Sequence, residues 1–347
     1  MRLLLLDGRD VQRLADTQLA DAAVRVAFGA MQDGEFTLPQ VLELDLTDRR
    51  AEIHAKGAFL HAAEDWALKV SSAFSLNPQR GIPAHSGLTI VFDANDGRPQ
   101  ALIVDGGFLT ELRTGAAGAL SSDLLARRDA TVAAVIGAGS QARFQLAALA
   151  RVRAIDEVRI TARSHESATA LAAEVAEVAE HHPFAVSALA DPEEAVAGAD
   201  VVITTTPARE PILRGEWLSE GAHVVAVGAD SPAKRELDRD VMRRATVIAV
   251  DDVGQATTRG ELRHALNEGS VDARDVVTLA ALLAGEAPGR AAPADITVAD
   301  LTGVGTQDAA IASLVVTAAR RRGVGRRLEL RDAPAPPVGA SRQGRDA

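Results

Sequence analysis

The chain has 347 residues, 47% of them hydrophobic and 24% charged, a composition typical of two folded domains that need no disulfide support. Its net charge of -11 and its 3% of aromatic residues argue against a nucleic-acid partner, because phosphate binding requires clustered cations and base stacking requires rings. The absence of cysteine and tyrosine excludes thiol catalysis and tyrosine-based acid catalysis, and since no apolar run is long enough to span a membrane we expect a cytoplasmic protein without a membrane partner.

The first 127 residues predict a strand, a helical region, an antiparallel sheet and a second helix. The apolar run within 1–7 predicts the strand, and apolar residues near a 3.6-residue period predict helix over 10–34, where Asp10 opens a short turn. A run rich in alanine, leucine and glycine predicts a closely packed helix over 110–127. Short runs between turn residues predict the strands of the antiparallel sheet, at 41–46, 52–60, 66–74, 88–93 and 100–105.

Strands and helices alternate after residue 130, which is typical of an α/β fold with a doubly wound parallel sheet, the Rossmann architecture. Residues 260–285 are expected to be helical, 296–301 to form a last strand, and 306–322 a helix that can return to the first domain. The proline-containing tail should be disordered. The alternating strands are expected at 131–136, 157–162, 184–188, 200–205, 222–227 and 246–250, and the helices at 140–150, 165–179, 191–197 and 238–243.

A Gly-x-Gly-x-x-Ala run joins the strand predicted at 131–136 to an alanine-rich helix. Gly137 permits the tight turn, Gly139 lets a pyrophosphate approach the backbone, and Ala142 lets the helix lie close to the sheet while its N-terminus faces the phosphates. Taken without its surroundings, the motif could equally be an ordinary strand-to-helix turn. The strand and helix around this one favour a dinucleotide site, and hence a nicotinamide-dependent oxidoreductase.

The end of the next strand distinguishes the two nicotinamide cofactors. NAD-specific proteins usually carry an acidic residue there, which binds the ribose 2′-hydroxyl. This chain has Arg163 and Ser164 instead, which favours NADP(H), with NAD(H) still possible. The alternative is that Arg163 is a solvated loop residue.

Two later strand ends carry polar residues that should border the nicotinamide, at 204–207 and 225–230. Asp230 is a candidate general acid or base at the mouth of the cleft. The alternative is a turn cap before Ser231 and Pro232, a role that aspartate often has. No His-Glu-x-x-His motif or comparable ligand cluster is present, so we expect no catalytic metal.

Two lysines are predicted to face each other in a hairpin. If strands 52–60 and 66–74 pair around Ala62 and Ala63, positions that sum to 125 are partners, and Lys56 lies opposite Lys69. Like charges in this arrangement repel, so either the pair belongs to an anion site or the register is wrong. Arg113, in the helix predicted at 110–127, is a third candidate cation and a possible bidentate partner for a carboxylate. The alternative for each cation is a solvated surface charge.

Several segments together resemble the ornithine cyclodeaminase/mu-crystallin family over residues 1–325: Asn77-Pro78 with Gly81-Ile82-Pro83, Leu112–Ala117, Gly137–Ala142, Ala226–Asp230 with Lys234–Leu237, and Asp300–Asp308. Within the family the chain is most similar to the ectoine-utilisation branch, because of Ala55-Lys56, Ala67–Ser71 and Thr297–Gly305. The resemblance implies a substrate-binding and dimerisation domain made of 1–125 and 306–328, a Rossmann domain over 126–305 and a disordered tail over 329–347. It also implies a homodimer that forms through the sheet of the substrate domain.

The resemblance further implies roles for single residues. Asp230 would be the catalytic acid or base, and Lys69, also counted as catalytic, would hold the substrate carboxylate with Arg113. Lys56 and Thr302 complete the expected substrate site. The expected cofactor site consists of Gly137, Gly139, Ser140, Gln141, Arg163, Ser164, Thr206, Ala226, Val227, Gly228, Lys234 and Leu301.

The chain departs from ornithine cyclodeaminases near the substrate. They carry an arginine soon after the first strand, where this chain reads Pro39–Leu44, and Lys56 falls near the place of an acid that contacts the substrate amine. We therefore expect an acidic or neutral imino acid substrate rather than ornithine. The expected reaction is hydride transfer at the α-carbon of an amino or imino acid, in either direction and possibly in ectoine catabolism. An ammonia-releasing cyclodeaminase and a non-catalytic NADPH-binding protein are the alternatives.

Overall fold

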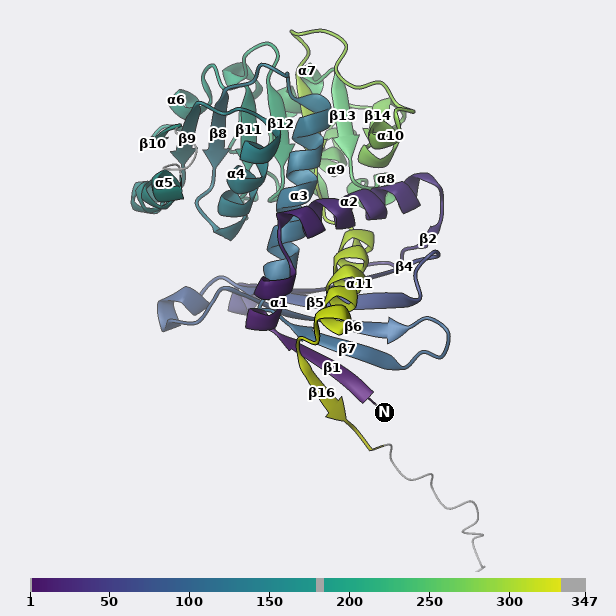
Figure 1. The fold of residues 1–347 in the computed structure, drawn as a ribbon. Coiled ribbons are helices and arrows are strands. Elements are labelled where there is room, and N and C mark those ends of the chain that lie inside the picture. Colours follow the sequence, from purple (N-terminus) through teal and green to yellow (C-terminus); the bar gives the residue numbers. More distant parts are fainter. Residues whose placement is uncertain (1, 179–183, 332–347) are drawn as a thin grey trace, which may run out of the picture.

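Two eight-stranded sheets, one above the other in Figure 1, make up the computed structural model, which describes residues 2–178 and 184–331. The lower sheet has the order β16-β1-β7-β6-β5-β4-β2, with β3 also paired to β4. All five strands expected between residues 41 and 105 are present. The strands of this sheet are β1 (Arg2–Asp7), β2 (Phe36–Thr37), β3 (Leu42–Leu46), β4 (Ala51–Leu60), β5 (Asp65–Phe74), β6 (His85–Asp93), β7 (Pro99–Val104) and β16 (Arg326–Glu329).

The edge of the lower sheet differs from the prediction. β1 runs parallel to β7, so the sheet is mixed, and β16 pairs antiparallel with β1. Glu329, where the disordered tail is predicted to begin, is the last residue of β16, and residues 332–347 lie outside the described residues. Strands from opposite ends of the chain meet here, and no local pattern reports such a pairing.

Two helices form where a short turn at Asp10 and a helix were expected over 10–34. They are α1 (Gly8–Leu14) and α2 (Thr17–Gln32), each begun by an aspartate that accepts hydrogen bonds from backbone N–H groups of the first turn, Asp7 for α1 and Asp16 for α2. Asp10 lies inside α1 instead of opening it. Its side chain accepts from the backbone N–H of Asp7 and completes a capping box.

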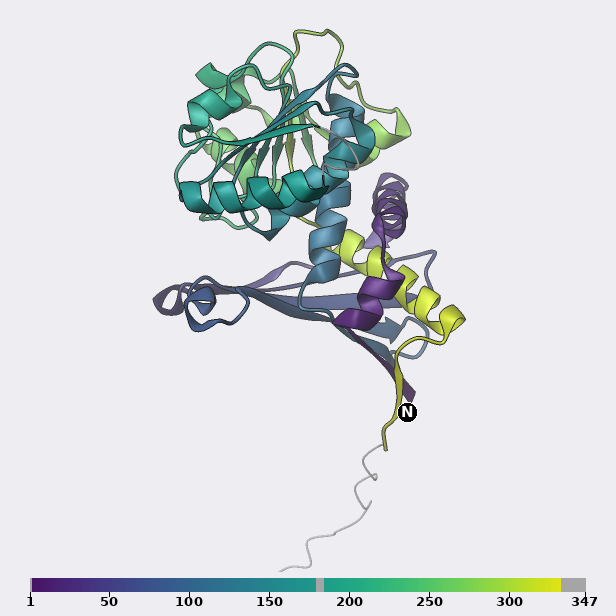
Figure 2. The ribbon, with the colours of Figure 1, turned by 60° about the vertical axis from the view of Figure 1, so that its left-hand side comes forward.

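The upper sheet is parallel throughout, in the order β10-β9-β8-β11-β12-β15-β13-β14, as the alternation of strands and helices predicts. Figure 2 shows helices on both of its faces. Its strands are β8 (Val132–Ile136), β9 (Glu157–Thr161), β10 (Ala185–Ala188), β11 (Val201–Thr204), β12 (His223–Ala226), β13 (Val247–Val250), β14 (Val276–Thr278) and β15 (Thr297–Asp300). Its helices include α4 (Ser140–Val152), α5 (His165–Val178), α6 (Pro192–Val196), α7 (Arg239–Arg244) and α8 (Val253–Ala256).

The continuous helix expected over 260–285 is wrong. The chain forms α9 (Gly260–Asn267), then strand β14, then α10 (Leu279–Ala284). Gly269, with φ +62°, takes the backbone out of helical geometry after α9. The valines and threonine of β14 then pair in parallel with β13, so an edge strand of the sheet interrupts the helical pattern.

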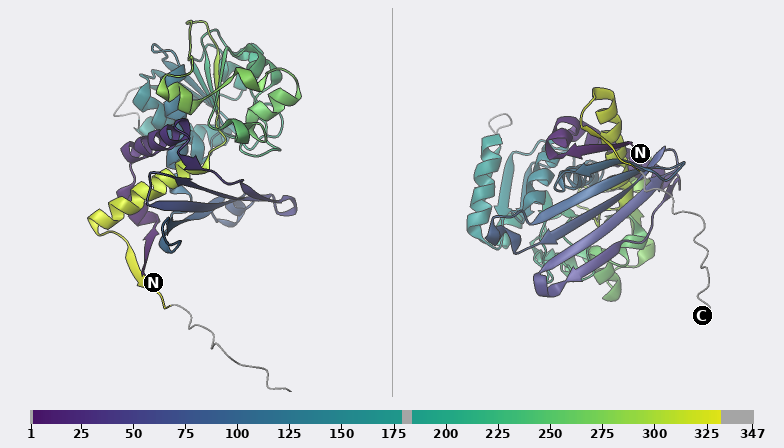
Figure 3. Two further views of the ribbon diagram at one scale, coloured as in Figure 1. Left: turned by 90° about the vertical axis from the view of Figure 1, so that its right-hand side faces the viewer. Right: turned by 90° about the horizontal axis from the view of Figure 1, so that it is seen from below.

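Two long helices join the sheets. α3 (Phe108–Leu125) runs from the lower sheet to the upper one (Figure 1) and is buried on nearly every side. α11 (Gly305–Arg322) leaves the upper sheet after β15 and packs on β4 and β5 of the lower sheet. This helix agrees with the one predicted at 306–322, which was expected to return to the first domain. The helices gather on one face of the lower sheet, and among residues 2–178 and 184–331 none covers its outer face (Figure 3). Within the described residues, no helix is long and apolar enough to cross a bilayer.

Candidate active site

The glycine loop after β8 has the geometry that a bound pyrophosphate requires. Gly137 has φ +125°, and a Cβ there would lie 2.5 Å from the Thr205 hydroxyl, so only glycine fits. A Cβ on Gly139 would meet nothing within 4 Å, so the space above the N-terminus of α4 is open. Ala142, in the first turn of that helix, is fully buried. The three residues thus occupy the places that the motif predicts, and Ser140 and Gln141 form the first turn between them.

Glu236 fixes the strand ends beside this loop. Its buried carboxylate accepts hydrogen bonds from the Thr204 hydroxyl (2.7 Å), the Thr206 backbone N–H (2.6 Å) and the Gly228 backbone N–H (2.8 Å). The Thr206 hydroxyl also donates to Glu236 (2.8 Å), so it faces inward. Sequence reasoning gave Glu236 no role, because nothing local links it to strand ends some thirty residues earlier.

The other expected cofactor residues lie around the same strand ends. Ala226, Val227 and Leu301 are buried, and the Leu301 backbone N–H donates to the Ala226 carbonyl oxygen (2.9 Å), which joins the ends of β12 and β15. Arg163 and Ser164 are exposed between β9 and α5. In the described part of the chain, Arg163 forms no hydrogen bond or ion pair, so its guanidinium is available to an anion.

The two hairpin lysines face each other, as the predicted pairing of positions that sum to 125 requires. Lys56 of β4 pairs in register with Lys69 of β5, and both are buried. The Lys56 Nζ donates to the carbonyl oxygens of Thr302 (3.0 Å) and Gly303 (2.9 Å), and the Lys69 Nζ lies 2.8 Å from the Asp308 Oδ2. Since the register is right, the other alternative, that the two buried ammonium groups belong to an anion site, stays a prediction.

Asp308 joins Lys69 to Arg113. The Arg113 Nε donates to the Asp308 Oδ1 (3.0 Å), and its Nη1 donates to the Gln307 Oε1 (3.1 Å). Burial lowers the pKa of Lys69 to about 8, although Asp308 raises it. Burial raises the pKa of Asp308, but Arg113 and Lys69 outweigh it and hold that pKa below its usual range. Asp308 thus pairs with two buried cations, and Lys56, a third, lies on the neighbouring strand.

Asp230 lies at the end of β12, and its side chain is partly exposed. Its Oδ1 is 2.7 Å from the Lys234 Nζ, which is also 2.6 Å from the Glu52 Oε1. Burial would raise the pKa of Asp230, but Lys234 and Lys56 hold that pKa well below its usual range, so the carboxylate is ionised at neutral pH. Lys234 contacts Asp230 and links it to β4 of the lower sheet, and its expected place beside the cofactor stays a prediction.

Thr302 positions Lys56 through its backbone. The Thr302 hydroxyl donates to the Asp251 Oδ1 (2.8 Å) and accepts from the Gln255 Nε2 (2.7 Å), so it is already engaged in a buried network. Its carbonyl oxygen binds Lys56. A direct contact of the Thr302 hydroxyl with substrate stays a prediction.

Lysine content is a signal that could have located this site. The chain contains three lysines among its 37 basic residues, and Lys56, Lys69 and Lys234 all lie here. The remaining cations are arginines, several of them on the surface. Within residues 2–178 and 184–331, no group of three or more histidine, aspartate or glutamate side chains could hold a metal ion.

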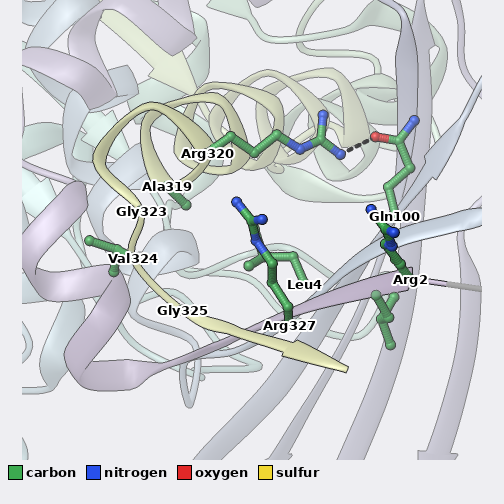
Figure 4. Close-up of a pocket in the computed structure, with 10 residues that line it drawn as sticks. Arg2, Leu4, Gln100, Ala319, Arg320, Gly323, Val324, Gly325 and Arg327 are labelled. Carbon is green, nitrogen blue, oxygen red and sulfur yellow. Dashed lines mark hydrogen bonds between the residues drawn. The ribbon is translucent and has the colours of Figure 1, made fainter. Parts of the chain in front are cut away.

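A separate pocket of about 370 Å³ lies between β1, β16 and the C-terminal end of α11 (Figure 4). Arg320 donates a hydrogen bond to Gln100 at its edge, and Arg2 and Arg327 also line it. Asp308 is at the other end of α11, a helix of 18 residues and roughly 27 Å. The pocket is therefore not part of the lysine cluster.

Comparison with known proteins gives consistent matches over nearly the whole chain. A model of the ornithine cyclodeaminase/mu-crystallin family matches residues 3–323. An uncharacterized cyclodeaminase of Sinorhizobium fredii is 44% identical over 294 residues, 84% of this chain and 88% of the relative. An archaeal alanine dehydrogenase dimer with bound NAD is 34% identical with a TM-score of 0.87, covering 95% of this chain and 99% of that one. The iminosuccinate reductase of Paracoccus denitrificans in complex with NAD+ is 31% identical with a TM-score of 0.85, covering 95% and 100%. These NAD-binding structures confirm the expected fold class.

Proposed function

The chain belongs to the ornithine cyclodeaminase/mu-crystallin family, and from this premise we propose that it is an NAD(P)-dependent oxidoreductase that transfers hydride at the α-carbon of an amino or imino acid. One observation carries the proposal. An ionised aspartate, Asp230, lies beside a buried cluster of cations at the carboxyl ends of the strands of a nucleotide-binding sheet.

The glycine loop and the strand ends fit a nicotinamide dinucleotide. The open space above Gly139 and the N-terminus of α4 suit the pyrophosphate, and the strand ends that Glu236 fixes border the nicotinamide. When bound, the nicotinamide supplies or accepts the hydride. NADP(H) is our preferred form, because Arg163 is exposed and unpaired in the described structure where NAD-specific proteins usually place an acid. The related structures above contain NAD, so cofactor preference has to be measured.

The substrate carboxylate binds Lys69 and Arg113 in this proposal. Both are buried and fixed by Asp308, so their geometry is set before substrate arrives. Lys56 adds a third charge from the neighbouring strand. Such a cationic site in a dry cleft stabilises a carboxylate far more than the same charges would in water.

Asp230 acts on the nitrogen of the substrate. Because its carboxylate is ionised at neutral pH, it stabilises a protonated imine in the reductive direction and accepts a proton from an ammonium group in the oxidative direction. Lys234 holds the carboxylate in place and keeps its pKa low. The ionised state thus favours the base over the acid in the expected role of Asp230.

The test is reduction of a panel of 2-oxo acids by NADPH or NADH in the presence of ammonia. We expect oxidation of the cofactor, and Asp230→Asn should lower kcat by about 10²- to 10⁴-fold while nucleotide affinity is kept. Asp240→Asn, on the exposed surface of α7, is the matched control. Full activity of Asp230→Asn would remove this residue from the mechanism. Absence of turnover with intact cofactor binding would favour the binding-only alternative, and conversion of ornithine to proline without net cofactor change would favour a cyclodeaminase.

A homodimer through the outer face of the lower sheet is part of the proposal. Leu42, Leu44 and Val104 are 55%, 50% and 44% exposed, and Trp66 stacks on Phe92 with ring centroids 4.2 Å apart in the same sheet. An apolar face without covering helices marks a protein interface. One related structure is a dimer. A cytoplasmic location and a role in ectoine catabolism stay predictions.

A further inference from the structure

Arg259 is a buried cation without a hydrogen-bond partner in the described structure. It lies immediately before α9 and is 8% exposed, and its Nε and Nη1 atoms form no hydrogen bond with any described residue. The Glu43 Oε2 is 3.6 Å from its Nη1, too far for a hydrogen bond. Removing a guanidinium from water without such bonds is costly, so its burial indicates an anionic ligand.

Arg259 lies on the opposite side of Lys56 from the Lys69 and Arg113 pair. Glu43, its nearest carboxylate, is on β3, which pairs with β4, and β4 carries Lys56. Lys69 is on β5, the next strand across. The cations therefore form a row across the inner face of the sheet, with Arg259 over the β3 side, Lys56 in the middle and Lys69 on the far side.

Lys56 and His54 complete this second group. The Lys56 Nζ uses two of its three donors on the carbonyl oxygens of Thr302 and Gly303, which leaves one donor for a ligand. Burial lowers the pKa of Lys56, Asp230 opposes this effect, and the charges of Arg113 and Arg259 lower the pKa further. His54, the cross-strand partner of Glu43, is buried with its Nε2 lacking a hydrogen bond among the described residues.

We propose that Arg259 and Lys56 form a second anion subsite, which binds the distal carboxylate of an amino or imino dicarboxylic acid whose α-carboxylate lies on Lys69 and Arg113. This inference rests on the proposed function. β3 and β5 are about 10 Å apart, two strand spacings. A four-carbon skeleton fits, because its carboxyl carbons are roughly 4 Å apart and each carboxylate adds a hydrogen bond of about 2.8 Å.

Glu43 gives the subsite a resting state. Its carboxylate is 3.6 Å from Arg259 and 3.7 Å from the His54 Nε2, and it forms a hydrogen bond to neither. It therefore neutralises part of the charge without filling the donor sites. A substrate with an uncharged side chain leaves the Arg259 Nε and Nη1 without a hydrogen bond, whereas a second carboxylate accepts hydrogen bonds from them, and this difference produces the selectivity.

The experiment compares two 2-oxo acids of four carbons, oxaloacetate and 2-oxobutanoate, which differ in the distal carboxylate. We expect the wild type to prefer oxaloacetate in kcat/KM by at least about tenfold. Arg259→Met should lose about 100-fold on oxaloacetate and change little on 2-oxobutanoate, and Arg259→Lys should recover part of the loss. Arg274→Met, which removes an exposed arginine, is the charge control. Equal losses on both substrates, or a wild type that prefers 2-oxobutanoate, would overturn the inference and leave the proposed function intact.

Equilibrium binding provides a second readout that needs no turnover. With NADPH present, succinate should bind the wild type more tightly than butyrate, and Arg259→Met should abolish the difference. Glu43→Gln, which removes the competing charge, should strengthen succinate binding, and this variant keeps the test decisive if Arg259→Met does not fold. Equal affinity for both ligands in the wild type would overturn the subsite. If no 2-oxo acid is reduced but succinate binds selectively, the proposed function fails and the subsite stands.

Discussion

The Lys234 Nζ lies 2.7 Å from the Asp230 Oδ1 and 2.6 Å from the Glu52 Oε1. Asp230 lies in the loop after β12 of the upper sheet and Glu52 belongs to β4 of the lower one, so one lysine links the two sheets at the proposed catalytic carboxylate. Its ammonium group also helps to keep the pKa of Asp230 low. Lys234 is thus a positioning residue for Asp230.

Removing Lys234 should change the pH profile. In the wild type the low pKa keeps Asp230 ionised far into the acid range, so the acid limb of kcat/KM lies at low pH. Lys234→Met should raise the pKa of Asp230 and shift that limb to higher pH, whereas Lys234→Arg should restore it. Rate measurements between pH 4 and 8 test the shift. A uniform loss of rate with an unmoved limb would mean that Lys234 has only a structural role.

The pKa of Lys69 should determine how substrate affinity falls at alkaline pH. Burial lowers its pKa to about 8, so the cation that holds the carboxylate is present below that pH and lost above it. The affinity for an anionic substrate should therefore fall about tenfold per pH unit above that pH. Asp308→Asn removes the negative charge that raises the pKa of Lys69, so in this variant substrate affinity should begin to fall at a lower pH. Because the chain has three lysines, ¹⁵N-lysine NMR can follow each ammonium directly, and a Lys69 pKa near its usual value would contradict this prediction.

Arg163 should discriminate between the two cofactors. Arg163→Ala should weaken NADPH binding about tenfold and leave NADH binding unchanged, because in the proposed complex the arginine contacts the 2′-phosphate. Fluorescence titration of both cofactors measures the two affinities. Arg209→Ala, another exposed arginine, is the control. An unchanged ratio of NADPH to NADH affinity would mean that Arg163 is a solvated loop residue that does not contact the cofactor.

The outer face of the lower sheet should determine the oligomeric state. Leu44→Glu places a charge on the outer face of β3, within the proposed interface, and should convert the dimer to monomer. Val26→Glu, at an equally exposed position on α2, should leave the dimer intact. Light scattering after size-exclusion chromatography measures the mass of each species. A Leu44→Glu protein that remains dimeric would place the interface elsewhere.

The sequence could predict the features that depend on nearby residues. Gly137 and Gly139 follow an apolar strand and open a helix, so their role is evident within a dozen positions. The pairing of Lys56 with Lys69 is likewise local, because a hairpin turn determines its register. The boundary between α1 and α2 was less evident, because Asp10, expected to open a short turn, lies inside α1, and Asp7 and Asp16 are the caps.

The tertiary structure alone decided which distant residues meet. Asp308 reaches Lys69 from 239 positions away only because α11 returns from the upper sheet to the lower one. Glu236 binds the ends of β11 and β12, and Arg259 approaches Glu43 across the gap between the sheets. No local pattern encodes these contacts, because burial and charge pairing depend on the packing of whole elements. The sequence by itself therefore determined the cofactor loop and the lysine pair, and the packing of the two sheets determined the charges around them.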